Sequence, residues 1–123
     1  MNEKKILIVD DEKDILLVLG KRLTAEGYTV ITVDNGYDAV TLAKSKSPDL
    51  ILLDILMPGM EGGEVAEKLK DCPETKNIPV IFLTALLSKA EEYKGNHLVA
   101  GNITLAKPID AEELLTQIKK KLL

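Results

Sequence analysis

The sequence predicts one α/β domain, a three-layer doubly wound sandwich in which helices cover both faces of a five-stranded parallel sheet. Strand-like and helix-like segments alternate along the chain, as they do in folds built from βαβ units. Three of the strand-like segments are apolar throughout, which is typical of strands buried on both faces of a parallel sheet. The other two have the features of edge strands, and the strand order 2-1-3-4-5 satisfies this division.

The expected strands are short segments that end at polar or turn-forming residues. The three central strands are expected at residues 5–9, 50–53 and 79–83. Residues 29–33 alternate threonine with valine or isoleucine, which suits a half-exposed edge strand. Residues 102–105 form a brief fifth strand, which we place at the opposite edge.

The expected helices follow the strands, at residues 12–26, 37–46, 63–71, 88–94 and from Asp110 to the C-terminal end. Gly27 ends the first helix as a left-handed residue, Pro73 ends the third, and Asp110 is a favoured N-cap for the last. The helix at residues 88–94 is expected to be short, because Gly95 and Asn96 interrupt it.

The composition is that of an ordinary globular domain, with 46% apolar and 29% charged residues. A net charge of −4 argues against nucleic acid or an anionic membrane as the domain's own main partner. Cys72 is the single cysteine, so no intrachain disulfide can form, and we expect a reducing compartment. We find no signal peptide or membrane-spanning run, and we therefore expect a cytoplasmic protein.

Carboxylates follow two of the central strands. Asp10 and Asp11 follow residues 6–9, and Asp54 follows residues 50–53. Because ligands of open α/β sheets bind at the carboxyl ends of the strands, these three side chains converge if the two strands are neighbours. Converging carboxylates repel one another and lose hydration, and a hard cation such as Mg²⁺ relieves both costs. The sequence therefore predicts an acidic metal pocket.

Two more polar residues follow strands at the same edge of the sheet. Thr84 follows residues 81–83, and Lys107 follows the fifth expected strand. A threonine hydroxyl can donate a hydrogen bond to a phosphoryl oxygen, and a lysine supplies a positive point charge, so the pair suits a reacting oxyanion. Each residue also has a simpler explanation taken singly: Asp11 as a helix N-cap, Thr84 as a turn hydroxyl and Lys107 as a solvated loop lysine.

These residues occur together with characteristic neighbours. In chain order, the set is Asp10-Asp11, Asp54 within Asp-Ile-Leu-Met-Pro-Gly-Met-Glu-Gly, Thr84-Ala85 and Lys107-Pro108. This set resembles the receiver domain of two-component response regulators, which has a flavodoxin-like sheet. The resemblance extends from Lys5 to the last helix, so we expect residues 1–123 to form one receiver domain.

The resemblance implies a phosphoacceptor and a magnesium site. Asp54 would accept a phosphoryl group from a phosphohistidine on a sensor kinase or a histidine phosphotransfer protein. Asp11, Asp54 and the backbone carbonyl of Ile55 would bind Mg²⁺, with Asp10 contributing directly or through a water. The chemistry would be in-line phosphoryl transfer, catalysed by positioning and charge neutralisation.

The resemblance also implies how the phosphoryl group is held and sensed. Thr84 would move toward the phosphoryl group and Lys107 would pair with it, with the Lys107–Pro108 peptide bond cis. A downstream protein would bind the face formed by the fourth helix, the fifth strand and the fifth helix, on a monomer or a phosphorylation-dependent dimer. Thr104 stands where the family usually has an aromatic residue, which affects the output step more than phosphorylation.

Two flanking residues predict a long-lived phosphoryl group. Leu56 and Leu86 occupy the positions two residues after the acceptor and two after the threonine, which tune phosphoryl lifetime in the family. Both are apolar and cannot orient an attacking water. We therefore expect slow self-dephosphorylation and a signalling switch that catalyses its own phosphorylation, not a turnover enzyme.

Two other functions fit parts of the sequence. A receiver-like binding module that is never phosphorylated remains compatible with Thr104, although the complete acidic pocket argues against it. A phosphatase with an aspartate nucleophile would also use Mg²⁺, a lysine and a threonine. Such enzymes usually carry a second acid two residues after the nucleophile, where this chain has Leu56.

Overall fold

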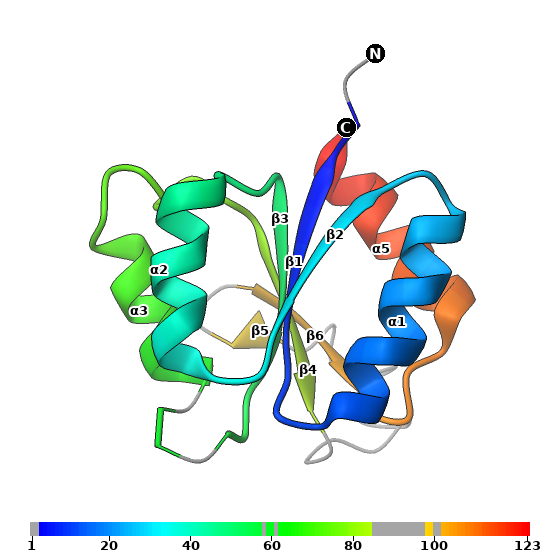
Figure 1. Ribbon diagram of the computed structural model, residues 1–123, viewed down its shortest axis with the longest axis horizontal. Helices are drawn as coiled ribbons and strands as arrows, with labels where there is room; N and C mark the ends of the chain where they lie inside the picture. The colour runs from blue at the N-terminus through cyan, green and yellow to red at the C-terminus, as the bar shows by residue number, and fades with distance from the viewer. Residues whose placement is uncertain (1–2, 58, 61, 85–97, 100–101) are drawn as a thin grey trace.

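A parallel sheet with helices on both faces forms the molecule in the computed structural model (Figure 1). The structure describes residues 3–57, 59–60, 62–84, 98–99 and 102–123. The strands are β1 (Lys5–Val9), β2 (Thr29–Val33), β3 (Leu50–Asp54), β4 (Val80–Thr84), β5 (Leu98–Val99) and β6 (Asn102–Ala106). The helices are α1 (Lys13–Ala25), α2 (Gly36–Lys46), α3 (Gly62–Lys70) and α5 (Ala111–Leu122). In Figure 1, α2 and α3 lie on one side of the sheet and α1 and α5 on the other.

The order of the strands confirms the predicted topology. The sheet order is β2-β1-β3-β4-β6-β5, and the first five of these strands pair in parallel. The predicted fifth strand is β6, so the predicted order 2-1-3-4-5 is correct. β5 pairs antiparallel with β6 and is not predicted by the sequence pattern. A strand of only two residues is too short to show a periodic pattern. The helix expected at residues 88–94 and Leu86 lie outside the described residues.

Two apolar layers bury the two faces of the sheet, because successive residues of a strand point to opposite faces. The layer under α2 and α3 takes its strand residues from Leu7, Val9, Ile51, Leu53 and Phe82. The layer under α1 and α5 takes them from Ile6, Ile8, Leu50, Leu52, Ile81 and Leu83. All of these side chains are buried, as the uninterrupted apolar runs predict. The rigid central strands therefore fix the positions of the polar residues at their carboxyl ends.

Three of the described helix ends are capped, and the sequence predicts two of these caps, at Gly27 and Asp110. Gly27 follows α1 with a φ of 98°, a left-handed conformation that a glycine adopts without strain. Asn35 caps α2, because its side-chain oxygen accepts a hydrogen bond from the N–H of Asp38 at 2.8 Å. Asp110 caps α5 in the same way, and its carboxylate accepts from the N–H groups of Glu112 and Glu113.

Candidate functional site

Three aspartates meet at the carboxyl ends of β1 and β3. These strands are parallel neighbours, with Val9 opposite Leu53, so Asp10 and Asp11 come close to Asp54. One carboxylate oxygen from each of the three lies within 4.8 Å of the other two. The predicted convergence is therefore confirmed. Three carboxylates at this spacing could bind a divalent metal ion, since hard cations take oxygen ligands.

Burial makes this cluster costly without a cation. Asp10 is fully buried and Asp54 is 2% exposed, whereas Asp11 is exposed. Burial, and then the charge of Asp10, raises the pKa of Asp54 from 3.8 to about 7. The charge of Lys107 and a hydrogen bond from the N–H of Leu56 act in the opposite direction, and they do not cancel the rise. The site thus favours either a proton on Asp54 or a cation beside it.

Lys107 supplies a positive charge to the cluster from the far end of β6. Its Nζ lies 2.9 Å from an oxygen of Asp10, 3.0 Å from Glu12 and 3.5 Å from Asp54. Burial alone lowers the pKa of Lys107, but its hydrogen bonds to Asp10 and Glu12 and the nearby negative charges raise it above the usual value. Lys107 therefore stays protonated and partly neutralises the carboxylates.

Glu12 is a member of the site that the sequence analysis missed. Its carboxylate contacts Lys107, and its backbone N–H donates a hydrogen bond of 2.9 Å to Asp10. Its position directly after the Asp10-Asp11 pair was the one available signal. Glu12 also occupies the N-cap position of α1, so the alternative explanation of Asp11 as that N-cap is wrong.

Thr84 lies at the end of β4, as the sequence predicts, and Ile55 directly follows β3. Thr84 is the last residue of β4 and is buried, and its carbonyl accepts a 2.8 Å hydrogen bond from the N–H of Lys107. The carbonyl of Ile55 accepts a 2.8 Å bond from Gly62, which leaves one of its two lone pairs for another partner. The peptide bond between Lys107 and Pro108 is cis, as the resemblance implies.

Thr104 lies in β6, opposite Phe82 of β4. Its side chain is buried, and its hydroxyl has no hydrogen-bond partner among the described residues. A small, buried polar side chain therefore occupies the position at which the family usually has an aromatic ring.

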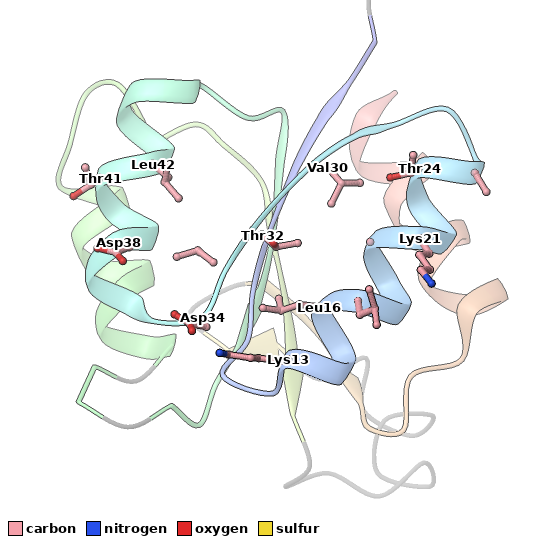
Figure 2. A pocket seen from close by; sticks show the side chains of 14 residues that line it. Lys13, Leu16, Lys21, Thr24, Val30, Thr32, Asp34, Asp38, Thr41 and Leu42 are labelled. Atoms are coloured by element: carbon pink, nitrogen blue, oxygen red, sulfur yellow. The ribbon is translucent and has the colours of Figure 1, made fainter.

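A groove on the described surface lies away from the acidic cluster. An open groove of about 1190 Å³ lies between α1 and α2 along the free edge of β2, and Figure 2 shows the side chains that line it. Lys13 and Lys21 come from α1, and Asp34 and Asp38 from the opposite wall. None of the predicted site residues lines this groove, so the groove is separate from the acidic cluster.

Comparison with known proteins shows the family. The family model of the response regulator receiver domain matches residues 6–119, so the chain belongs to this family. It is 42% identical to the response regulator PleD of Caulobacter vibrioides over 115 residues, which cover 94% of this chain and 25% of PleD. The chain thus spans a quarter of the length of this curated relative. Receiver domains are signalling switches and not enzymes in the usual sense.

Solved structures agree with this assignment. The chemotaxis protein CheY4 of Vibrio cholerae matches with a TM-score of 0.85 and 30% identity, covering 98% of this chain and all of the other. The response regulator TrrA of Thermotoga maritima, solved in complex with Mg²⁺ and BeF, matches with a TM-score of 0.80 and 35% identity, covering 97% of this chain and 99% of TrrA. Within the ranges that the structure describes, no helix is long and apolar enough to cross a membrane.

Proposed function

We propose that the chain is a phosphoacceptor switch in which Asp54 receives a phosphoryl group from a phosphohistidine of a sensor kinase or a histidine phosphotransfer protein. An oxygen of Asp54 forms a bond to phosphorus while the phosphorus–nitrogen bond breaks. The leaving imidazole keeps the bonding electrons and takes up a proton. The product is an aspartyl phosphate that changes the contacts of the domain with other proteins.

The observation that carries the proposal is the convergence of Asp10, Asp11, Asp54 and Lys107 on one small volume. A site with this much negative charge repels an anionic phosphoryl donor unless cations are present. Mg²⁺ would be held by the three aspartates and the carbonyl of Ile55, and it would supply the positive charge that a phosphoryl donor needs. These residues suit Mg²⁺, because every atom that would bind the ion is an oxygen.

The remaining residues hold the transferred group. The charge of Lys107 is already 3.5 Å from an Asp54 oxygen, so it can pair with a phosphoryl oxygen after a small movement. Thr84 lies at the end of the neighbouring strand β4, and its carbonyl is hydrogen-bonded to the N–H of Lys107. Its hydroxyl can donate a hydrogen bond to a second phosphoryl oxygen. Both groups act by position and charge, as phosphoryl transfer requires.

The output partner would be another protein, bound at the face that includes β6 and α5. Thr104 in β6 stands where the family usually has an aromatic residue, so a side chain other than that ring would sense the phosphorylated state. The domain acts as a monomer or as a dimer that forms on phosphorylation.

The test is intact mass after incubation with acetyl phosphate and Mg²⁺. The wild type is expected to gain one phosphoryl group, with acetate released, and Asp54→Asn to gain none. Adding EDTA before the donor should prevent the adduct. An unmodified wild type under conditions in which Mg²⁺ binding is measured would reject the proposal and favour a binding module that is not phosphorylated.

A further inference from the structure

Glu12 competes for the lysine that the proposed reaction needs. The ammonium of Lys107 has three hydrogens, and three carboxylates surround it. Nζ is 3.0 Å from Glu12 and 2.9 Å from Asp10, but 3.5 Å from Asp54. The acceptor therefore has the longest of the three contacts, and Glu12 has one of the two shorter ones.

A backbone hydrogen bond fixes the position of the main chain at Glu12. Its N–H is hydrogen-bonded to Oδ1 of Asp10, while Oδ2 of the same carboxylate pairs with Lys107. Asp10 thus joins the main chain at Glu12 to the ammonium, and the glutamate side chain spans the remaining distance. Because Glu12 is 59% exposed and Lys107 only 10%, Glu12 can move away into water more easily than the buried aspartates can.

We propose that Glu12 is a positioning residue that holds Lys107 in the unphosphorylated state and releases it when an anion occupies Asp54. The proposal rests on the proposed function, since it concerns the same lysine and the same acceptor. The ion pair between Lys107 and Glu12 must break before the ammonium can pair with a phosphoryl group. Glu12 therefore weakens the binding of phosphoryl-like anions and opposes the active state.

Beryllofluoride with Mg²⁺ is a suitable probe, because it imitates a phosphoryl group on the aspartate without covalent turnover. Its affinity can be measured by isothermal titration calorimetry for the wild type, Glu12→Gln and Glu12→Asp. We expect both variants to bind beryllofluoride about two- to fivefold more tightly, the range for losing an exposed ion pair. Glu74→Gln, an exposed glutamate in the loop before β4, is the matched control and should leave the affinity unchanged.

The two variants distinguish a direct contact between Glu12 and Lys107 from a general effect of the negative charge at position 12. Glu12→Asp keeps the negative charge but is one methylene shorter, so it loses reach to Lys107. Tighter binding by Glu12→Gln alone would mean that only the charge matters, and it would overturn the proposal. In a Lys107→Ala background, Glu12→Gln should no longer tighten binding, and a persisting gain would also overturn it.

The Mg²⁺ affinity of each variant provides a readout that a general change in structure would not produce. Removing Glu12 does not add a metal ligand, so Mg²⁺ should bind no more tightly than in the wild type while beryllofluoride binds more tightly. If both affinities rise together, Glu12 does not act through Lys107. A wild type that binds no beryllofluoride and forms no Asp54 adduct would overturn both this proposal and the proposed function. Normal wild-type binding with unchanged variants would overturn the role of Glu12 alone.

Discussion

At Asp54, burial and like charge act in the same direction. The side chain is almost fully buried and lies beside Asp10, and both effects raise the pKa of Asp54. A carboxylate that is harder to ionise in the folded state binds its proton more tightly there than in the unfolded chain. The acceptor therefore destabilises the metal-free protein at neutral pH, which is the cost of placing a nucleophile in a buried acidic site.

Asp54→Asn should stabilise the metal-free protein at high pH and not at low pH. The pKa of Asp54 is about 7 in the folded state, against an ordinary value of 3.8, so folding takes up a proton between these pH values. Wild-type stability is therefore lost, relative to the variant, as pH rises from about 4 to about 7. At pH 8 in EDTA, we expect the variant to be more stable by on the order of 2–4 kcal/mol.

Denaturant unfolding of both proteins at pH 4 to 8, with EDTA throughout, measures this difference. A difference that stays constant with pH would show that the ionisation of Asp54 does not carry the cost. Excess Mg²⁺ at pH 8 should reduce the advantage of the variant, because the cation compensates the ionised carboxylate only in the wild type.

At the scale of elements, the start of α3 supports the end of β3. The N–H of Gly62 donates to the carbonyl of Ile55, and the backbone of Gly62 lies directly against the carbonyl oxygen of Asp54. A Cβ at Gly62 would collide with that oxygen and would come within 2.8 Å of the Ile55 Cα. Both neighbours are backbone atoms and cannot rotate away. The absence of a side chain at Gly62 is therefore part of how Asp54 is positioned.

Gly62→Ala should displace the end of β3 and weaken the site. The crowding is expected to lower the free energy of unfolding by about 1–3 kcal/mol, and phosphorylation by acetyl phosphate should slow. Gly63→Ala is the matched control, because among the described residues nothing beyond its chain neighbours and its own helix backbone lies within 4 Å of the added Cβ. Since alanine favours helices, the control should be neutral or more stable by up to about 1 kcal/mol.

Unfolding experiments and the rate of mass gain, measured on both variants, test this. Equal stability and equal rates for the two alanine variants would mean that the backbone relaxes around position 62 at no cost.

For the whole molecule, the acidic site couples metal binding to stability. The cluster joins β1 and β3 at the centre of the sheet, and Lys107 adds the end of β6. A cation bound there would hold the ends of separate strands together and remove their repulsion. The unfolded chain separates these residues, so it cannot offer the same site.

Mg²⁺ should therefore raise the melting temperature of the wild type. At ten times the dissociation constant, the stabilisation is about 1.4 kcal/mol, which corresponds to a shift of roughly 4–7 °C for a domain of this size. Asp11→Asn should reduce or abolish the shift, whereas Glu74→Gln should retain it. A shift of the same size in Asp11→Asn, measured by thermal unfolding with Mg²⁺ or EDTA, would place the metal elsewhere.

Most of the fold and most residues of the candidate site could be predicted from the sequence, because the signals that indicate them are local. The apolar runs fix which segments are buried strands, and a polar residue at the end of such a run must lie at the edge of the sheet. Asp10, Asp54 and Thr84 follow their strands in this way, and the structure brings them to one edge.

Which side chains meet, and how favourable their contacts are, depends on the packing of elements that are distant in the sequence. Glu12 and Lys107 are 95 residues apart, and no pattern within either segment indicates that their charges lie 3.0 Å from each other. The close approach of Gly62 to Asp54 and the direction in which the pKa of Asp54 moves also depend on packing between elements. Which elements form, and which polar residues end them, could be predicted from the residues alone, because those signals are local. The distances between these residues follow from how the strands and helices pack, so only the folded chain contains them.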